Sequence, residues 1–259
     1  MILRFSKLLF ITFSSILLSC NDRTPKEKEQ SLSLADIDTT VSAGLKSNNS
    51  FTQLNTTPNA IILTGLPNVR LISIYKIPNN GDKNILYDEG TTYDERDENE
   101  FNEVNFRYYM PGIDIIRGYN LVNIAHFQSD KDSLSYFFNR PVLIRTLYFP
   151  GVKKDSLEKN PVLRNFFLVS VYEADTNNDS LINNKDLRRL YFINETNTEK
   201  ISLLPENYST IRSTYDYKRD IMYIHARNDR NKNGKAEKDE PISIFMLDLK
   251  NPKLAKKVI

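Results

Sequence analysis

The run Asn165-Phe-Phe-Leu-Val-Ser-Val-Tyr172, followed closely by Asp175-Thr-Asn-Asn-Asp-Ser-Leu-Ile-Asn-Asn-Lys-Asp186, decides the fold. The first stretch is short and rich in β-branched and aromatic residues, which suits a buried strand better than a helix. The second is rich in Asp and Asn, which dominate turns and supply oxygen ligands to cations. Because Ile221–His225 precedes Asp229–Glu240 in the same way, a strand followed by such a loop occurs twice.

The chain from about residue 60 onward has the same character. Short apolar and aromatic runs alternate with turns rich in Asn, Asp, Gly and Pro, and helical periodicity is scarce. The sequence therefore predicts one all-β domain over residues 59–259. We expect strands at Val69–Ile77, Tyr119–Phe127, Pro141–Phe149, Asn165–Tyr172, Arg189–Ile193, Thr210–Tyr217, Ile221–His225 and Ile242–Leu249.

The first residues have the layout of an export signal. Arg4 and Lys7 precede the apolar run Leu8–Leu18, which is shorter than the roughly 20 residues of a membrane-spanning helix. The ending Leu17-Leu-Ser-Cys20 resembles the lipobox of bacterial lipoproteins. The resemblance implies that residues 1–19 are removed and that Cys20 is lipidated, with palmitate among its acyl chains. We expect attachment to the lipid bilayer of the bacterial cell envelope, at the outer membrane.

Composition and charge indicate a tether at the start of the mature chain and exclude several kinds of cross-link and partner. Residues 20–58 are polar and are expected to form a flexible tether behind the lipid. Cys20 is the one cysteine in the chain, which excludes intramolecular disulfides and cysteine-based metal sites. The net charge of +2 falls to zero once Arg4 and Lys7 are removed, and no clustered basic face points to a nucleic-acid partner.

Residues 175–186 follow the twelve-residue pattern of an EF-hand calcium loop. Ca²⁺ takes about six to eight oxygen ligands, and such a loop supplies them from alternate positions. Position six, which usually holds Gly because φ is positive there, holds Ser180, and position twelve holds Asp rather than Glu. We therefore expect the first site to be the weaker. Its predicted ligands are Asp175, Asn177, Asp179, the Leu181 backbone carbonyl, Asn183 and Asp186.

Residues 229–240 follow the same pattern with Gly234 at position six and Glu240 at position twelve. The two loops begin 54 residues apart, and a structural Ca²⁺ ion is predicted in each. The predicted ligands of the second site are Asp229, Asn231, Asn233, the Lys235 backbone carbonyl, Glu237 and Glu240. Ile182, at position eight of the first loop, is expected to attach that loop to the body of the domain.

The segments on both sides of each loop look like strands. In this respect the loops resemble the calcium-loop hairpins of some β-propeller blades, and residues 189–259 resemble a TolB-type, WD40-like blade. The resemblance implies a β-propeller-like array of antiparallel hairpins with the calcium loops between strands; a β-sandwich is the alternative. The loops also resemble those of dockerins, although dockerin loops are followed by helices and lie closer together.

No catalytic constellation stands out, so we predict that the chain is not an enzyme. His126 and His225 lie within apolar, strand-like runs, and the Ser156–Lys159 spacing of S-x-x-K falls in a charged turn. Thr91–Glu103 is expected to be an exposed acidic loop, with a third cation site as the alternative. The function predicted is that of a structural or ligand-binding module whose partner is an unknown glycan or protein. A glycan-processing enzyme or accessory, with unidentified carboxylates, and a dockerin-like docking module are the alternatives.

Overall fold

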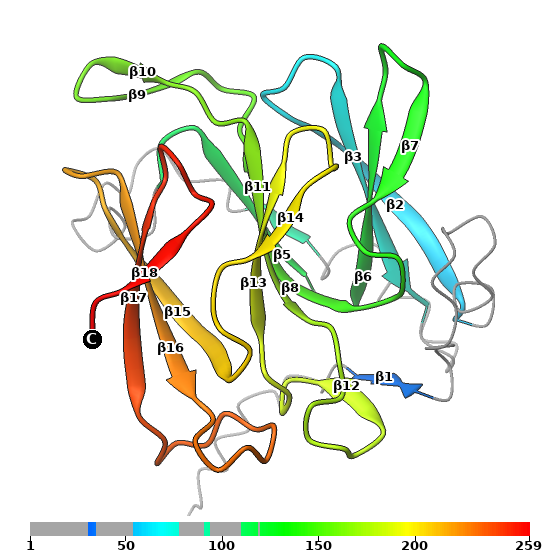
Figure 1. Ribbon diagram of the computed structural model, residues 1–259. Helices are drawn as coiled ribbons and strands as arrows, with labels where there is room; N and C mark the ends of the chain where they lie inside the picture. The colour runs from blue at the N-terminus through cyan, green and yellow to red at the C-terminus, as the bar shows by residue number, and fades with distance from the viewer. Residues whose placement is uncertain (1–30, 35–53, 78–90, 94–109, 119) are drawn as a thin grey trace, which may run out of the picture.

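The computed structural model describes residues 31–34, 54–77, 91–93, 110–118 and 120–259 (Figure 1). Every regular element in these ranges is a strand, and every strand pairing is antiparallel. The expected all-β class is therefore confirmed, and the described strands do not form a closed propeller. The expected signal peptide, Cys20 and residues 94–103 of the acidic segment lie outside the described residues.

Three sheets each contain four antiparallel strands that follow one another in the sheet (Figure 1). The first consists of β2 (Thr56–Leu63), β3 (Val69–Lys76), β6 (Leu121–Gln128) and β7 (Ser133–Tyr136). The second consists of β8 (Leu143–Pro150), β11 (Phe166–Tyr172), β13 (Arg189–Asn194) and β14 (Lys200–Ser202). The third consists of β15 (Tyr208–Asp216), β16 (Ile221–Asn228), β17 (Ile242–Asp248) and β18 (Ala255–Lys257).

The remaining strands extend this arrangement. Between β3 and β6 the chain contributes β4 (Thr91–Tyr93) and β5 (Ile113–Gly118), which join the second sheet beside β8 and make it six-stranded. β9 (Asp155–Leu157) and β10 (Asn160–Val162) pair with each other, as do β1 (Ser31–Ser33) and β12 (Leu181–Asn183).

The six-stranded sheet has an apolar cluster on each of its faces. In β11, Phe167 and Val169 belong to the cluster shared with the first sheet, whereas Phe166 and Leu168 belong to the cluster shared with the third. Alternate residues of a strand face opposite sides, so a strand buried on both faces needs an unbroken apolar run. This explains why β11, apart from Ser170, has apolar and aromatic residues on both faces rather than alternating with polar ones.

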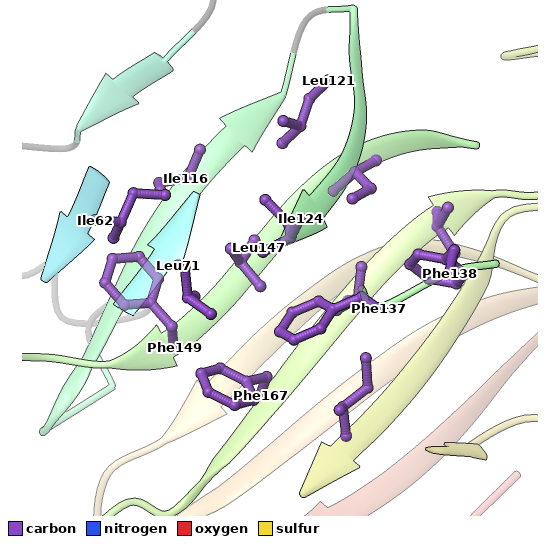
Figure 2. Packing of buried hydrophobic residues seen from close by; sticks show 14 of the residues in the cluster. Ile62, Leu71, Ile116, Leu121, Ile124, Phe137, Phe138, Leu147, Phe149 and Phe167 are labelled. Atoms are coloured by element: carbon purple, nitrogen blue, oxygen red, sulfur yellow. The ribbon is translucent and has the colours of Figure 1, made fainter. Parts of the chain in front are cut away.

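The cluster between the first and second sheets is shown in Figure 2. Leu71 and Ile124 of the first sheet are fully buried there, as are Leu147 and Phe167 of the second. The rings of Phe167 and Phe137 lie 5.2 Å apart between centroids. Since burial of each large apolar side chain contributes about 1.5–3 kcal/mol, this cluster is a main source of stability for the two sheets.

A buried ion pair joins the second and third sheets. Arg164, between β10 and β11, donates from its two Nη atoms to both carboxylate oxygens of Asp220, at 3.0 and 2.7 Å. Its remaining donors reach the carbonyl oxygens of Pro111 and Leu249, each at 3.1 Å. The Tyr215 hydroxyl donates to Asp220 at 2.9 Å. Because the guanidinium and the carboxylate are both well supplied with partners, the pair avoids the cost of an uncompensated buried charge.

Two parts of the segment predicted to be a tether take part in the fold. β1 lies within residues 20–58 and pairs with β12, and β2 begins at Thr56, before the predicted domain boundary at 59. Leu32 and Leu54 are almost completely buried, in a cluster with Val122, Leu143 and Ile182. The burial of the two leucines explains why these parts of the predicted tether are folded. Moving each apolar side chain out of water stabilises the fold although the neighbouring residues are polar.

Candidate metal centres

Loop 1, which we define as residues 175–186, connects β11 to β13, and loop 2, residues 229–240, connects β16 to β17 (Figure 1). β11 pairs with β13 and β16 pairs with β17, so each loop joins two adjacent strands. The predicted position of both loops between paired strands is therefore confirmed. In each sheet the loop follows the second strand of the four-stranded unit.

Position one of each loop organises the first turn of that loop. The Oδ1 and Oδ2 atoms of Asp175 accept the backbone N–H groups of Asp179 and Ser180 at 3.0 and 2.8 Å. In loop 2, Asp229 accepts from Asn233 and Gly234 at 3.1 and 2.9 Å. The two loops therefore use the same bonds, from positions five and six to position one.

Position twelve closes each loop in the same way. Asp186 accepts the backbone N–H groups of Thr176 and Asn183, at positions two and nine, at 2.7 and 2.8 Å. Glu240 accepts those of residues 230 and 237, the same two positions, at 2.9 and 3.1 Å. Asp186 is 1 % exposed and Glu240 is 9 % exposed, so both carboxylates are largely withdrawn from water.

The backbone conformations of the loops also agree. Positions four and six have positive φ in both: 59° at Asn178 and 66° at Ser180 in loop 1, and 59° at Lys232 and 74° at Gly234 in loop 2. The positive φ expected at position six is confirmed. Ser180 adopts it at a cost of about 1–2 kcal/mol that glycine avoids.

The two loops touch each other directly. The Thr176 hydroxyl of loop 1 donates to the carbonyl oxygen of Gly234 in loop 2 at 2.6 Å. A Cβ atom on Gly234 would lie 1.7 Å from the carbonyl oxygen of Thr176, which no real contact allows. The same hydroxyl accepts the backbone N–H of Leu187 and reaches Asp186 at 3.2 Å. One threonine therefore connects position twelve of loop 1 with position six of loop 2.

The other predicted ligands lie within this framework. Asp179 and Asn183 each accept the N–H group two residues ahead, as do Asn231 and Asn233. The side chain of Asn231 also donates to Glu237 at 2.9 Å. The backbone carbonyl groups predicted to bind the ions belong to Leu181 and Lys235. Leu181 lies in β12 and pairs with Ser33 of β1, and the backbone N–H of Lys235 donates to Asn233.

Loop 1 contains polar atoms that lack a protein partner. Both side-chain polar atoms of Asn177, at position three, are buried and make no hydrogen bond. The side-chain amide nitrogen of Asn183 is also buried and makes no hydrogen bond. Within the described ranges, no group of three or more His, Cys, Asp or Glu side chains is arranged as a metal site. The predicted ligand sets combine carboxylates with Asn and backbone oxygens. The unpaired side-chain oxygen of Asn177 is an amide oxygen, which is a ligand that Ca²⁺ binds.

Burial governs the electrostatics of Asp186. Removal from water raises the pKa of this carboxyl above its usual range, and the hydrogen bonds from the Asn183 and Thr176 amides oppose that rise. The ion pairs of Arg164 with Asp220 and of Lys253 with Glu199 do not involve Asp186, Asp229 or Glu240.

β1 is a feature of loop 1 that sequence reasoning missed. β12 occupies positions seven to nine of the loop, and β1 pairs with it through Ser31–Asn183, Leu32–Ile182 and Ser33–Leu181. The Leu34 N–H also donates to the Ser180 carbonyl at 3.0 Å. Ile182 is 2 % exposed, so its expected burial is confirmed. The alternating Ser-Leu-Ser-Leu at 31–34 was the available signal, and it is short.

The two histidines and the S-x-x-K segment lie outside the two loops. His126 is buried, contacts the Phe137 and Phe167 rings, and hydrogen-bonds the Glu195 carbonyl through Nε2 at 2.8 Å. Burial lowers its pKa. His225 lies in β16, where burial and Arg212 lower its pKa. Ser156 lies in β9, and Lys159 lies in the turn that leads to β10.

Neither a protein-family model nor a curated protein nor a solved structure shows significant similarity to the chain. Among the residues that the structure describes, none belongs to a helix long and apolar enough to cross a membrane.

Proposed function

We propose that loops 1 and 2 bind Ca²⁺ and that the bound ions stabilise an all-β structural or ligand-binding module of the bacterial cell envelope. The observation that carries this proposal is the repetition of the same hydrogen bonds at positions one and twelve of both loops. The loops have the same residue only at positions one and three, so their common geometry is not a consequence of identical sequence. Two unrelated turns have no physical reason to share it.

The charges in the loops support a cation as the ligand. Asp186, Asp229 and Glu240 are all buried, and a buried carboxylate is costly unless an opposite charge compensates it. A divalent cation supplies that charge, and the Asn177 side-chain oxygen then gains a partner. Ca²⁺ suits the donor set because it binds carboxylate, amide and backbone oxygens together. We propose that loop 1 is the weaker site because Ser180 is strained and Asp186 is a short carboxylate.

Isothermal titration calorimetry of the full-length chain in detergent tests this proposal. We expect two Ca²⁺ ions to bind per chain, and Asp229→Asn to abolish binding at loop 2. The matched control is Asp248→Asn, which removes an exposed carboxylate that accepts the Lys250 N–H in an ordinary turn. It should leave both sites intact. A wild-type chain that binds no Ca²⁺, or an Asp229→Asn chain that binds two ions, would contradict the proposal.

We further propose that lipid on Cys20 holds the module at the membrane. The support is the lipobox-like Leu17-Leu-Ser-Cys20 and the absence of any other cysteine. In a bacterial host fed a labelled fatty acid, the wild-type chain should carry the label and sediment with membranes. Cys20→Ser should lose the label, and a labelled Cys20→Ser chain would refute this part of the proposal.

The sheet order supports a propeller-like reading of the fold. Each sheet contains four consecutive antiparallel strands, and both loops join the second and third of these strands. We propose that the three units are blade-like, with β5 and β4 added beside β8, the first strand of the second unit. An experimental structure in which the three units do not surround a common axis would favour the sandwich instead.

A further inference from the structure

A partly open cavity of about 190 Å³ lies between the second and third sheets. β5, β8 and β11 line it on one side and β15 lines it on the other. Its described lining includes the arginines Arg117, Arg188 and Arg212 and contains no Asp or Glu. Guanidinium groups without neighbouring carboxylates favour an anionic ligand.

A row of polar residues crosses the sheet on the cavity side. Arg117 in β5 pairs with Thr146 in β8, and Thr146 pairs in turn with Ser170 in β11. The rest of this face belongs to the apolar cluster that the second and third sheets share. Arg117 lies at the exposed end of this row and Ser170 at its buried end, so the row leads from the surface into the interface.

The opposite wall is shaped by a break in the β15 pairing. The register of β15 with β16 shifts between Thr210 and Arg212. Arg188 holds this bulge, since its Nε donates to the Thr210 carbonyl at 2.7 Å and its Nη2 donates to the Ile211 carbonyl. Bulges change the direction of side chains beside binding sites, and here Thr210, Arg212 and Ser213 all line the cavity.

Two hydroxyl-bearing side chains of the cavity, Tyr148 and Thr210, differ in whether their hydroxyl groups have a hydrogen-bond partner. The Tyr148 hydroxyl is hydrogen-bonded to Ser213, and burial raises the pKa of Tyr148. Thr210 is only 7 % exposed, yet its Oγ1 atom has no hydrogen-bond partner in the described structure. A buried hydroxyl without a partner is unfavourable, and a bound molecule that accepts its hydrogen would remove that cost.

We infer that this cavity binds a small organic acid. The carboxylate would lie against the arginines and accept the Thr210 hydroxyl, and the apolar body would pack on Met110, Ile115 and Met222. A cavity of roughly 150 Å³ holds benzene, so 190 Å³ suits a ligand of about the size of benzoate. The ligand proposed here is an organic anion and not Ca²⁺, although Arg188 of the cavity follows Asp186 of loop 1 by only two residues.

Calorimetric titration of the calcium-loaded full-length chain with benzoate tests the inference. We expect one benzoate to bind per chain, and benzyl alcohol, which lacks the charge, to bind at least about tenfold more weakly. Arg212→Gln and Thr210→Val should each weaken benzoate binding by roughly tenfold, the loss of one good hydrogen bond to an anion. Arg219→Gln removes an exposed arginine of the β15–β16 turn and should have no effect.

Three results would overturn the inference. The first is no saturable binding of benzoate or hexanoate, and the second is equal affinity for benzyl alcohol. The third is tighter binding of inorganic phosphate than of either organic acid, which would assign the cavity to a different anion. Since Ca²⁺ binding is measured separately, each of these results leaves the calcium proposal standing.

Discussion

Gly234 is subject to two independent constraints. Its φ of +74° belongs to a region that glycine adopts freely, and its α-carbon lies against the Thr176 backbone of the other loop. The sequence pattern predicts the first constraint, because position six of such a loop turns through positive φ. The second depends on contact between segments 54 residues apart, which no local pattern contains. The sequence did not single out Thr176, because position two of such a loop supplies no ligand.

Substitution at position six should therefore have opposite effects in the two loops. Gly234→Ala combines a strained φ with a backbone clash, and we expect it to lower the free energy of unfolding by more than about 2 kcal/mol. Ser180→Gly relieves the strain at an exposed position and should raise it by about 1 kcal/mol. Chemical denaturation of both variants measures these changes. Equal destabilisation by the two would contradict the account of the loop backbones.

The pKa of Asp186 gives a prediction for pH. Burial raises the folded-state pKa above 3.8, so in the absence of Ca²⁺ this group favours folding at low pH, and that contribution is lost as pH rises through the raised pKa. Ca²⁺ binds the carboxylate form, so the stabilisation by Ca²⁺ should grow over the same range. Melting curves with and without Ca²⁺, recorded over the pH range in which Asp186 loses its proton, test this prediction. Asp186→Asn should remove the part of the pH dependence that belongs to loop 1.

At the scale of elements, the eight strands expected from the sequence are all present, as β3, β6, β8, β11, β13, β15, β16 and β17. β3, β13, β16 and β17 begin at the residues where the apolar runs begin, because burial requires those residues to leave water. The strands that were not predicted include β4, at the start of the expected acidic loop, and the short strands β1, β9, β10 and β12. Each has three residues, too few for an alternation to stand out, and β1 exists only through its pairing with loop 1.

The pairing of β1 with β12 makes the N-terminal segment part of loop 1. Leu32→Ala removes a fully buried side chain, and we expect a loss of about 2–5 kcal/mol in the free energy of unfolding. Because Leu32 pairs with Ile182 at position eight, the variant should also weaken Ca²⁺ binding at loop 1 and leave loop 2 unchanged. Denaturation and calorimetry measure the two effects.

Leu63→Ala is the matched control for this prediction, since Leu63 is 56 % exposed on β2 and should tolerate the change. A Leu32→Ala chain as stable as the Leu63→Ala chain would show that β1 does not contribute to loop 1 in solution.

At the scale of the whole molecule, the sequence predicted the class but not the order of the strands. The β4–β5 segment leaves the first sheet and completes the second, and this exchange has no counterpart in composition or periodicity. The 54-residue spacing of the loops was readable because each loop occupies the same place in its sheet. The N-terminal sheet has the same four-strand order without such a loop among its described residues, so its relation to the others could be recognised only from pairing.

The central claim is that Ca²⁺ in the two loops stabilises the fold, and thermal unfolding of the full-length chain tests it most directly. With Ca²⁺ at about ten times the dissociation constant, each site adds about 1.4 kcal/mol, so two sites should raise Tm by roughly 5–10 °C over the chain in EDTA. In the Asp175→Asn, Asp229→Asn double variant that rise should disappear. An identical Tm for the wild-type chain with Ca²⁺ and with EDTA would contradict the account.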